Sequence, residues 1–68
     1  MQDFKVSTEY YGDKVVFDIR PFKTFFSIEL EHQLISILGH RENWIQLLGD
    51  LPDIAVDELI AAIESNVV

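Results

Sequence analysis

Residues 4–20 read FKVSTEYYGDKVVFDIR and alternate apolar with polar side chains on both sides of a glycine. Such two-residue alternation is typical of half-buried strands, and Gly12-Asp13 supplies a two-residue turn in which glycine accepts positive φ. The pairs predicted across this turn are Tyr11 with Lys14, Tyr10 with Val15, Thr8 with Phe17, and Val6 with Ile19. The last three pairs lie on one face, so turn chemistry and hydrophobic pattern agree on an antiparallel β-hairpin.

The segment after this hairpin has two interpretations. Pro21 ends the second strand or places it at the edge of a sheet, because proline cannot donate a backbone hydrogen bond. Residues 22–26 (FKTFF) then form either a short third strand or an irregular aromatic connector. The sequence leaves both alternatives open.

Helices are predicted for the rest of the chain. Residues 27–38 suit a helix capped by Ser27 and stopped by Gly39, with apolar residues at helical spacing at Leu30, Leu34, Ile37 and Leu38. A shorter helix over 41–48 would bury Trp44, Leu47 and Leu48. A third helix after Pro52 carries a stripe of Val56, Leu59, Ile60 and Ile63. The predicted fold is therefore a single α+β domain, residues 1–68, with an N-terminal antiparallel hairpin packed against two or three C-terminal helices.

Composition and charge restrict the classes of partner. The chain has 68 residues, 49% of them hydrophobic, and no cysteine. Its formal net charge of −7 is uneven, since residues 42–68 contain six acids and no base. Direct binding to nucleic acid or to an anionic membrane needs lysine and arginine, so neither is expected, and a basic protein partner is permitted. No apolar run is long enough to span a bilayer, and no signal peptide is evident, so we expect a cytoplasmic protein.

Catalysis and metal binding are not predicted. Ser36 and His40 would stand one turn apart on a helix, but no nucleophile-elbow sequence surrounds the serine. His32 and His40 would be two turns apart, too far to share one ion without help from another element. Asp50, Asp53 and Asp57 do not follow the ligand pattern of a calcium loop. We therefore expect no enzyme, no metal and no cofactor.

The acidic C-terminal third is the first candidate binding surface. One interpretation is a solvated helix face that only keeps the protein in solution. The other is an array of carboxylates that imitates DNA phosphates and occupies the basic groove of a nucleic-acid enzyme. The residues of this predicted acidic face are Asp50, Asp53, Asp57, Glu58 and Glu64.

An aromatic patch is the second candidate. Its members exceed what the inner face of one hairpin needs, so they are either core under the helices or anchors of a protein interface. The residues of this predicted patch are Tyr11, Phe22, Phe25 and Phe26.

The functional hypothesis is a non-catalytic, protein-binding module, namely a small stoichiometric inhibitor or adaptor. In type, as a short acidic chain without cysteine or a catalytic motif, it resembles phage-encoded inhibitors of host enzymes and defence systems, anti-CRISPR proteins among them. That resemblance implies a DNA mimic or a blocker of a nucleic-acid enzyme. The alternative is a structural homo-oligomer, at minimum a homodimer, held together by the aromatic patch.

Overall fold

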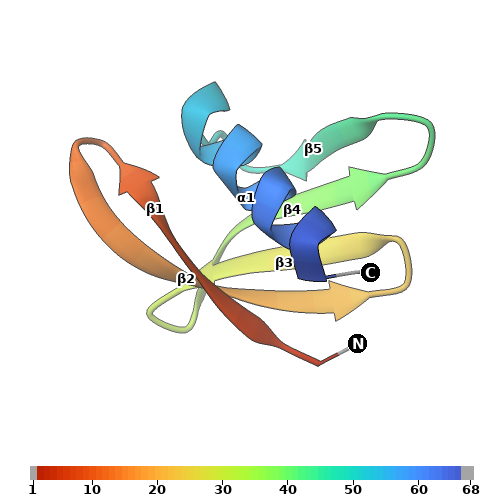
Figure 1. Cartoon of the computed structure of the whole chain (residues 1–68), viewed down its shortest axis with the longest axis horizontal. Coiled ribbons are helices and arrows are strands. Elements are labelled where there is room, and N and C mark those ends of the chain that lie inside the picture. The colour runs from red at the N-terminus through yellow and green to blue at the C-terminus, as the bar shows by residue number, and fades with distance from the viewer. Residues whose placement is uncertain (1, 67–68) are drawn as a thin grey trace.

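A computed structural model describes residues 2–66, which form one antiparallel sheet and one helix. The five strands follow each other in space as they do in sequence, so the sheet is a simple meander. The helix lies across one face of this sheet (Figure 1). The elements are β1 (Phe4–Tyr10), β2 (Asp13–Phe22), β3 (Phe25–Leu30), β4 (Gln33–His40), β5 (Trp44–Leu48) and α1 (Asp53–Asn66).

The predicted N-terminal hairpin is confirmed, but its register was wrong by two residues. Tyr10 pairs with Asp13, so the turn residues are Tyr11 and Gly12 rather than Gly12 and Asp13. Both have positive φ, 52° and 85°, as a type I′ turn requires. Since a shift of two residues preserves the face of every side chain, the predicted inner face survives. Its pairs are Thr8 with Val15, Val6 with Phe17, and Phe4 with Ile19.

Residues 22–26 contain the second hairpin turn. Phe22 ends β2 and pairs with Phe25, the first residue of β3, leaving Lys23 and Thr24 as the turn. Lys23 has a φ of 56°. Of the two interpretations of this segment, the strand holds for Phe25 and Phe26. Pro21 pairs with Phe26 inside the sheet.

The helix predicted over 27–38 was wrong, because this stretch crosses from β3 into β4. The two strands are joined by Glu31 and His32, which have positive φ of 51° and 67°. Neither is a typical turn residue, so the sequence gives no sign of the reversal. Leu34, predicted to face the core, pairs with Glu29 and is 49% exposed.

The helix predicted over 41–48 was also wrong, and β5 takes its place. β5 pairs with β4 from His40–Trp44 to Ile37–Leu48, with an irregularity in register between Ile37 and Leu38. A strand here satisfies the backbone groups at the free edge of β4, which outweighs the weak helix propensity of so short a segment.

The third predicted helix is confirmed as α1, so one helix packs on the sheet instead of two or three. Leu59 and Ile63 are fully buried, as the apolar stripe predicts, whereas Val56 and Ile60 are only partly buried. Ala55, outside the predicted stripe, is buried as well. The helix therefore presents Ala55, Leu59 and Ile63 to the sheet.

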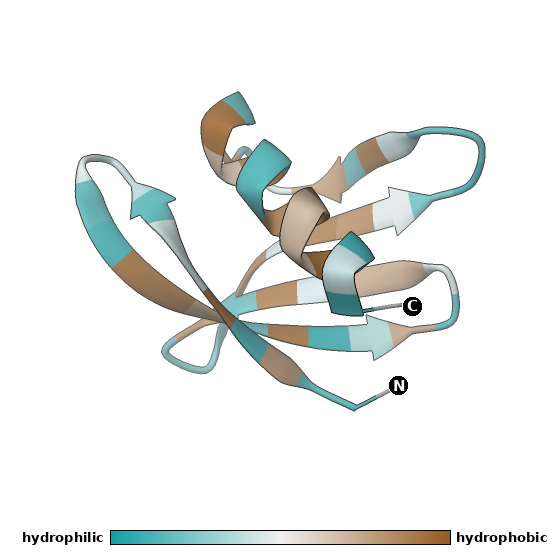
Figure 2. Cartoon of the chain, viewed as in Figure 1, coloured by the Kyte–Doolittle hydropathy of each residue, from teal (hydrophilic) through white to brown (hydrophobic). Residues whose placement is uncertain are grey.

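The hydrophobic core lies between α1 and the inner face of the sheet. Apolar and polar positions alternate along the strands, which directs one set of side chains toward the helix (Figure 2). The buried hydrophobic side chains of the sheet are Phe17, Ile19, Phe26, Ile28 and Leu38. No element among residues 2–66 covers the opposite, outer face, so its side chains decide what this protein presents to a partner.

Candidate functional site

The outer face of the sheet, from the end of β2 to β5, carries a cluster of large hydrophobic side chains, most of them exposed, here called the open-face patch. Phe22 is 63% exposed, Ile45 58% and Leu47 49%. They gather because Phe22 pairs with Phe25, and β4 and β5 bring further apolar residues alongside. The open-face patch consists of Phe22, Phe25, Ile37, Ile45, Leu47 and Leu48.

Gly39 allows side chains from β3 and β5 to approach each other across β4 in the open-face patch. This glycine lies on β4 between Phe25 of β3 and Ile45 of β5. A Cβ at position 39 would lie 2.7 Å from Leu47 Cδ1 and 3.6 Å from Phe25 Cδ1. The side chains of Phe25 and Leu47 therefore close over Gly39 from two strands and bury it.

Two apolar depressions lie on this part of the outer face, and Phe25 and Leu47 line both of them. The first, of about 540 Å³, includes Ile45 and is bordered by His40 and Arg41. The second, of about 340 Å³, includes Phe22 and Ile37. The open-face patch thus contains two hollows that share Phe25 and Leu47 as lining residues. Such relief can interlock with a complementary apolar surface.

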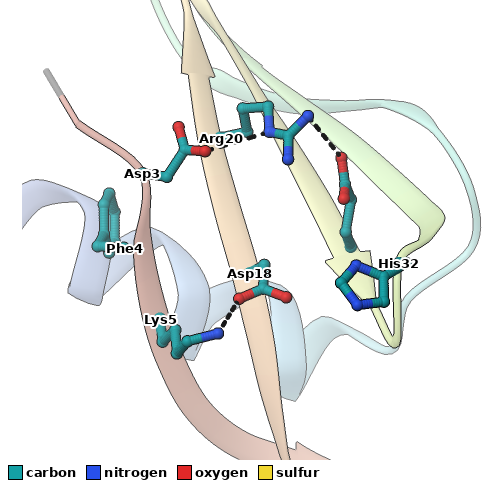
Figure 3. A pocket seen from close by; sticks show the side chains of 7 residues that line it. Asp3, Phe4, Lys5, Asp18, Arg20 and His32 are labelled. Carbon is teal, nitrogen blue, oxygen red and sulfur yellow. Dashed lines mark hydrogen bonds and ion pairs between the residues drawn. The ribbon is translucent and has the colours of Figure 1, made fainter.

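The rest of the outer face, over β1–β3, is charged. Lys5 Nζ lies 2.5 Å from Asp18 Oδ1, and Arg20 reaches both Asp3 at 3.2 Å and Glu29 at 3.8 Å (Figure 3). His32 stands at the border of the same shallow pocket. Because these acids and bases pair with one another, this half of the face presents little net charge.

Asp18, in the middle of this charged half, has a lowered pKa. The hydrogen bond from Lys5 lowers the pKa of this carboxyl, and the positive charges of Lys5, His32 and Arg20 act in the same direction. Partial burial opposes the shift. The carboxylate therefore stays ionised at neutral pH and holds Lys5 across the β1–β2 pair.

The predicted acidic face is divided by the structure. Glu58 accepts a hydrogen bond from the hydroxyl of Thr8, a fully buried residue of β1. Glu64 accepts one from Trp44 Nε1 of β5 at 3.4 Å. Both carboxylates therefore fasten α1 to the sheet, at strands on opposite edges of the meander.

The remaining acids project from the helix side of the molecule. Asp53 and Asp57 are one turn apart, and Glu64, the acceptor of the Trp44 hydrogen bond, lies two turns further, so the three lie along one line of α1, here called the acidic line. Asp50 is exposed just before the helix. Within residues 53–66 no lysine or arginine interrupts this line.

The predicted aromatic patch is divided too. Phe22 and Phe25 lie side by side in the open-face patch, while Phe26, on the other face of β3, is 8% exposed and belongs to the core. Tyr11 is exposed at the β1–β2 turn, at the opposite end of β2 from Phe22. Two of the four predicted aromatic residues therefore belong to the open-face patch, and the other two lie elsewhere.

Four members of the open-face patch were missed by the sequence analysis: Ile37, Ile45, Leu47 and Leu48. Helical spacing had assigned three of them to buried helix faces. Residues 44–48 (WIQLL) do not alternate apolar with polar side chains, so this segment carries no two-residue sign of a strand.

Ser36 and His40 do not form the helical pair that the sequence suggested. Ser36 is fully buried on β4, and its Oγ lies 2.7 Å from Gln46 Oε1 and 2.7 Å from the carbonyl oxygen of Leu48. His40 is exposed and stacks on Trp44 with ring centroids 4.6 Å apart. Between residues 2 and 66, no three His, Cys, Asp or Glu side chains come together as a metal site would require. In the same part of the chain, α1 is too short and too polar to cross a bilayer.

No protein-family model matches the chain, and no curated protein or solved structure is significantly similar to it.

Proposed function

We propose that this chain is a non-catalytic protein-binding module that works through its open-face patch. The observation that carries the proposal is a sheet with one face covered by α1 and the other left with half-exposed Phe22, Ile45 and Leu47. Contiguous apolar surface of this kind costs free energy in water and is typical of surfaces that another protein covers. A few side chains buried in well-packed pockets, aromatic ones among them, also contribute most of the affinity at protein interfaces.

Such a module fits a small stoichiometric inhibitor or adaptor, because occupying a partner surface requires no chemistry from the chain. The open-face patch supplies the energy of association through burial of apolar area. The charged half of the outer face would lie beside that contact and favour partners whose own charges match its pairs.

The test compares two isoleucines of similar exposure on opposite sides of the molecule. Ile45, 58% exposed, belongs to the open-face patch, and Ile54, 68% exposed, to the first turn of α1. The immobilised wild-type chain, Ile45→Lys and Ile54→Lys are each offered host lysate and an untagged copy of the chain, then washed at high salt. We expect Ile45→Lys to lose a protein that wild type and Ile54→Lys retain. Equal retention by all three would contradict the proposal.

A second candidate function is favoured by the acidic line, which faces away from the open-face patch. Asp53, Asp57 and Glu64 would attract a basic protein surface, such as the groove of a nucleic-acid enzyme, over a range set by salt. Asp57→Lys should then abolish the capture of a lysate protein that the wild-type chain binds at low salt and releases at high salt. Glu42→Lys, in the loop before β5, should leave that capture unchanged. If both reversals bind as wild type does, the acidic line serves only solvation.

A further inference from the structure

Two bases border the open-face patch. Lys23, in the turn between β2 and β3, lies over the Phe22 ring with its Nζ 5.7 Å from the ring centroid. Arg41, in the loop between β4 and β5, lines the apolar hollow that contains Ile45. Each base therefore adjoins apolar side chains that a partner would cover together with it. We call Lys23 and Arg41 the basic rim.

The two bases of the rim lie at the same end of the sheet. The N–H of His40, the residue before Arg41, donates a hydrogen bond of 3.1 Å to the carbonyl oxygen of Thr24, the residue after Lys23. Figure 1 shows the turn between β2 and β3 and the loop between β4 and β5 at one end of the sheet. One ligand group at this end can therefore face both bases.

The basic rim is not neutralised by ion pairs. On the outer face the ion pairs involve Lys5 and Arg20, and among residues 2–66 neither Lys23 nor Arg41 forms one. Glu42 follows Arg41 in the same loop, but it pairs with neither base and does not line the hollow. An unpaired positive charge beside an apolar hollow is complementary to a carboxylate that carries apolar neighbours.

The charges of the whole chain are distributed in the same sense. All five bases belong to the sheet and its turns, whereas the charged residues of α1 are all acids. Because α1 covers the inner face of the sheet, an acidic partner is repelled on the helix side of the molecule. It meets bases only on the outer face and at its turns.

The form of the surface favours a protein segment over a small molecule or a membrane. Small-molecule sites enclose most of the surface of their ligand, whereas Ile45 and Leu47 in this hollow are about half exposed. An anionic membrane attracts clusters of lysine and arginine, and this chain offers it two bases against a net charge of −7. A segment of protein laid across both hollows covers the patch and brings a carboxylate to its rim.

From these observations we infer that the open-face patch binds an acidic, apolar segment of another protein, in which an aspartate or glutamate adjoins large apolar side chains. The apolar side chains fill the two hollows that share Phe25 and Leu47. The carboxylate pairs with Arg41, whose guanidinium can donate two parallel hydrogen bonds to it, and Lys23 lies at the same end. This inference rests on the proposed function and names the chemistry of the partner of the same surface.

The first test selects ligands for the full chain from a displayed library of random peptides. Wild type should enrich peptides in which aspartate or glutamate adjoins aromatic or aliphatic residues. The double reversal of Lys23→Glu with Arg41→Glu should enrich lysine or arginine beside the same apolar residues, because only the sign of the rim has changed. Lys14→Glu reverses an exposed base at the opposite end of β2 from Phe22 and should keep the wild-type preference.

The second test measures the affinity of one enriched acidic peptide by calorimetry. Arg41→Glu should raise its dissociation constant about tenfold, since an attraction at the border of the contact becomes a repulsion, and Lys14→Glu less than about twofold. Rising salt should weaken the binding to wild type but not to Arg41→Glu. Ile45→Ser, which removes apolar contact without adding charge, should also cost about tenfold, whereas the exposed Ile54→Ser on α1 should bind as wild type does.

Circular dichroism shows whether each variant keeps the fold, and Arg41→Glu and Ile45→Ser change different parts of the site, so either one alone suffices. Enriched peptides without a preference for acid, if Ile45→Ser loses them, overturn the inference and leave the proposed function standing. Peptides that bind Ile45→Ser and wild type equally contradict both, because their contact lies elsewhere. A library that yields no ligand overturns the inference. So does a wild-type dimer in sedimentation equilibrium that Ile45→Ser dissociates, because a second copy then occupies the patch.

Discussion

Ser36 and Gln46 are joined across β4 and β5 by a hydrogen bond of 2.7 Å between Ser36 Oγ and Gln46 Oε1. The same Gln46 oxygen accepts the backbone N–H of Leu51 at 2.8 Å. One amide therefore connects the interior of the sheet to the segment that leads into α1. Leu51 is itself buried, so this connection sets where the helix begins its path over the core.

Replacement of Gln46 tests this connection. Gln46→Leu removes the acceptor of the part-buried Leu51 N–H and one of the two acceptors of the Ser36 hydroxyl, which keeps only the Leu48 carbonyl oxygen. We expect a loss of about 2 kcal/mol in the free energy of unfolding, measured by urea denaturation. Gln33→Leu, at the exposed start of β4, should change it by less than about 0.5 kcal/mol. Equal losses in the two variants would show that the Gln46 hydrogen bonds do not stabilise the fold.

Gly49, directly after β5, and Gly12 both have positive φ, but only Gly49 is crowded. A Cβ at Gly49 would collide with the Ile35 carbonyl oxygen and lie 3.0 Å from Ser36 Cα, whereas one at Gly12 would meet nothing within 4 Å. Gly12→Ala should cost about 1 kcal/mol for the strained φ alone. Gly49→Ala should cost about 3 kcal/mol because the clash is added. Thermal unfolding measures both, and a smaller loss for Gly49→Ala would contradict the close approach.

Glu58 and Asp57 are neighbours on α1 with different roles. Glu58→Ala leaves the buried Thr8 hydroxyl without its acceptor and should cost about 1.5 kcal/mol of unfolding free energy. Asp57→Ala introduces the same residue one position away and should stay within about 0.5 kcal/mol. Denaturant unfolding of the two variants provides the comparison. Equal stabilities would assign Glu58, like Asp57, to the solvent-facing surface only.

The Lys5–Asp18 pair predicts a pH dependence. Because folding lowers the pKa of Asp18, ionised Asp18 stabilises the folded state at pH values above its unfolded pKa, near the ordinary 3.8. This contribution is lost as pH falls through the lower, folded value. In Lys5→Met the largest cause of the shift is gone, so the pKa of Asp18, followed by NMR of its carboxyl carbon, should rise. An unchanged titration would show that Lys5 does not hold this carboxylate in solution.

The helices predicted over 27–38 and 41–48 show where reasoning from sequence fails. Short apolar runs fit a helix and a strand about equally well. The turn between β3 and β4, at Glu31 and His32, lies within the first predicted helix and contains no glycine, proline or asparagine. Mistaking strands for helices also hid the open-face patch. Helical spacing directed Leu47 and Leu48 inward, whereas on β5 they are about half exposed.

The sequence identified the five acids of the predicted acidic face, but these acids do not form one continuous binding surface. Among them, Glu58 and Glu64 turn out to hold α1 to β1 and β5. A side chain separated from its partner by 50 residues, as Glu58 is from Thr8, leaves no local pattern that could reveal the contact.

By itself, the sequence determined the features that depend on neighbours along the chain. These are the first hairpin and its inner face, the helix after Pro52, and the collection of acid in the last third. The tertiary structure alone decided that residues 25–48 contain the three strands β3, β4 and β5, because a strand's hydrogen bonds are made with another segment of the chain. It also decided which apolar residues stay exposed. With only one helix to cover one face of a five-stranded sheet, the other face keeps Phe22, Ile45 and Leu47 in contact with solvent.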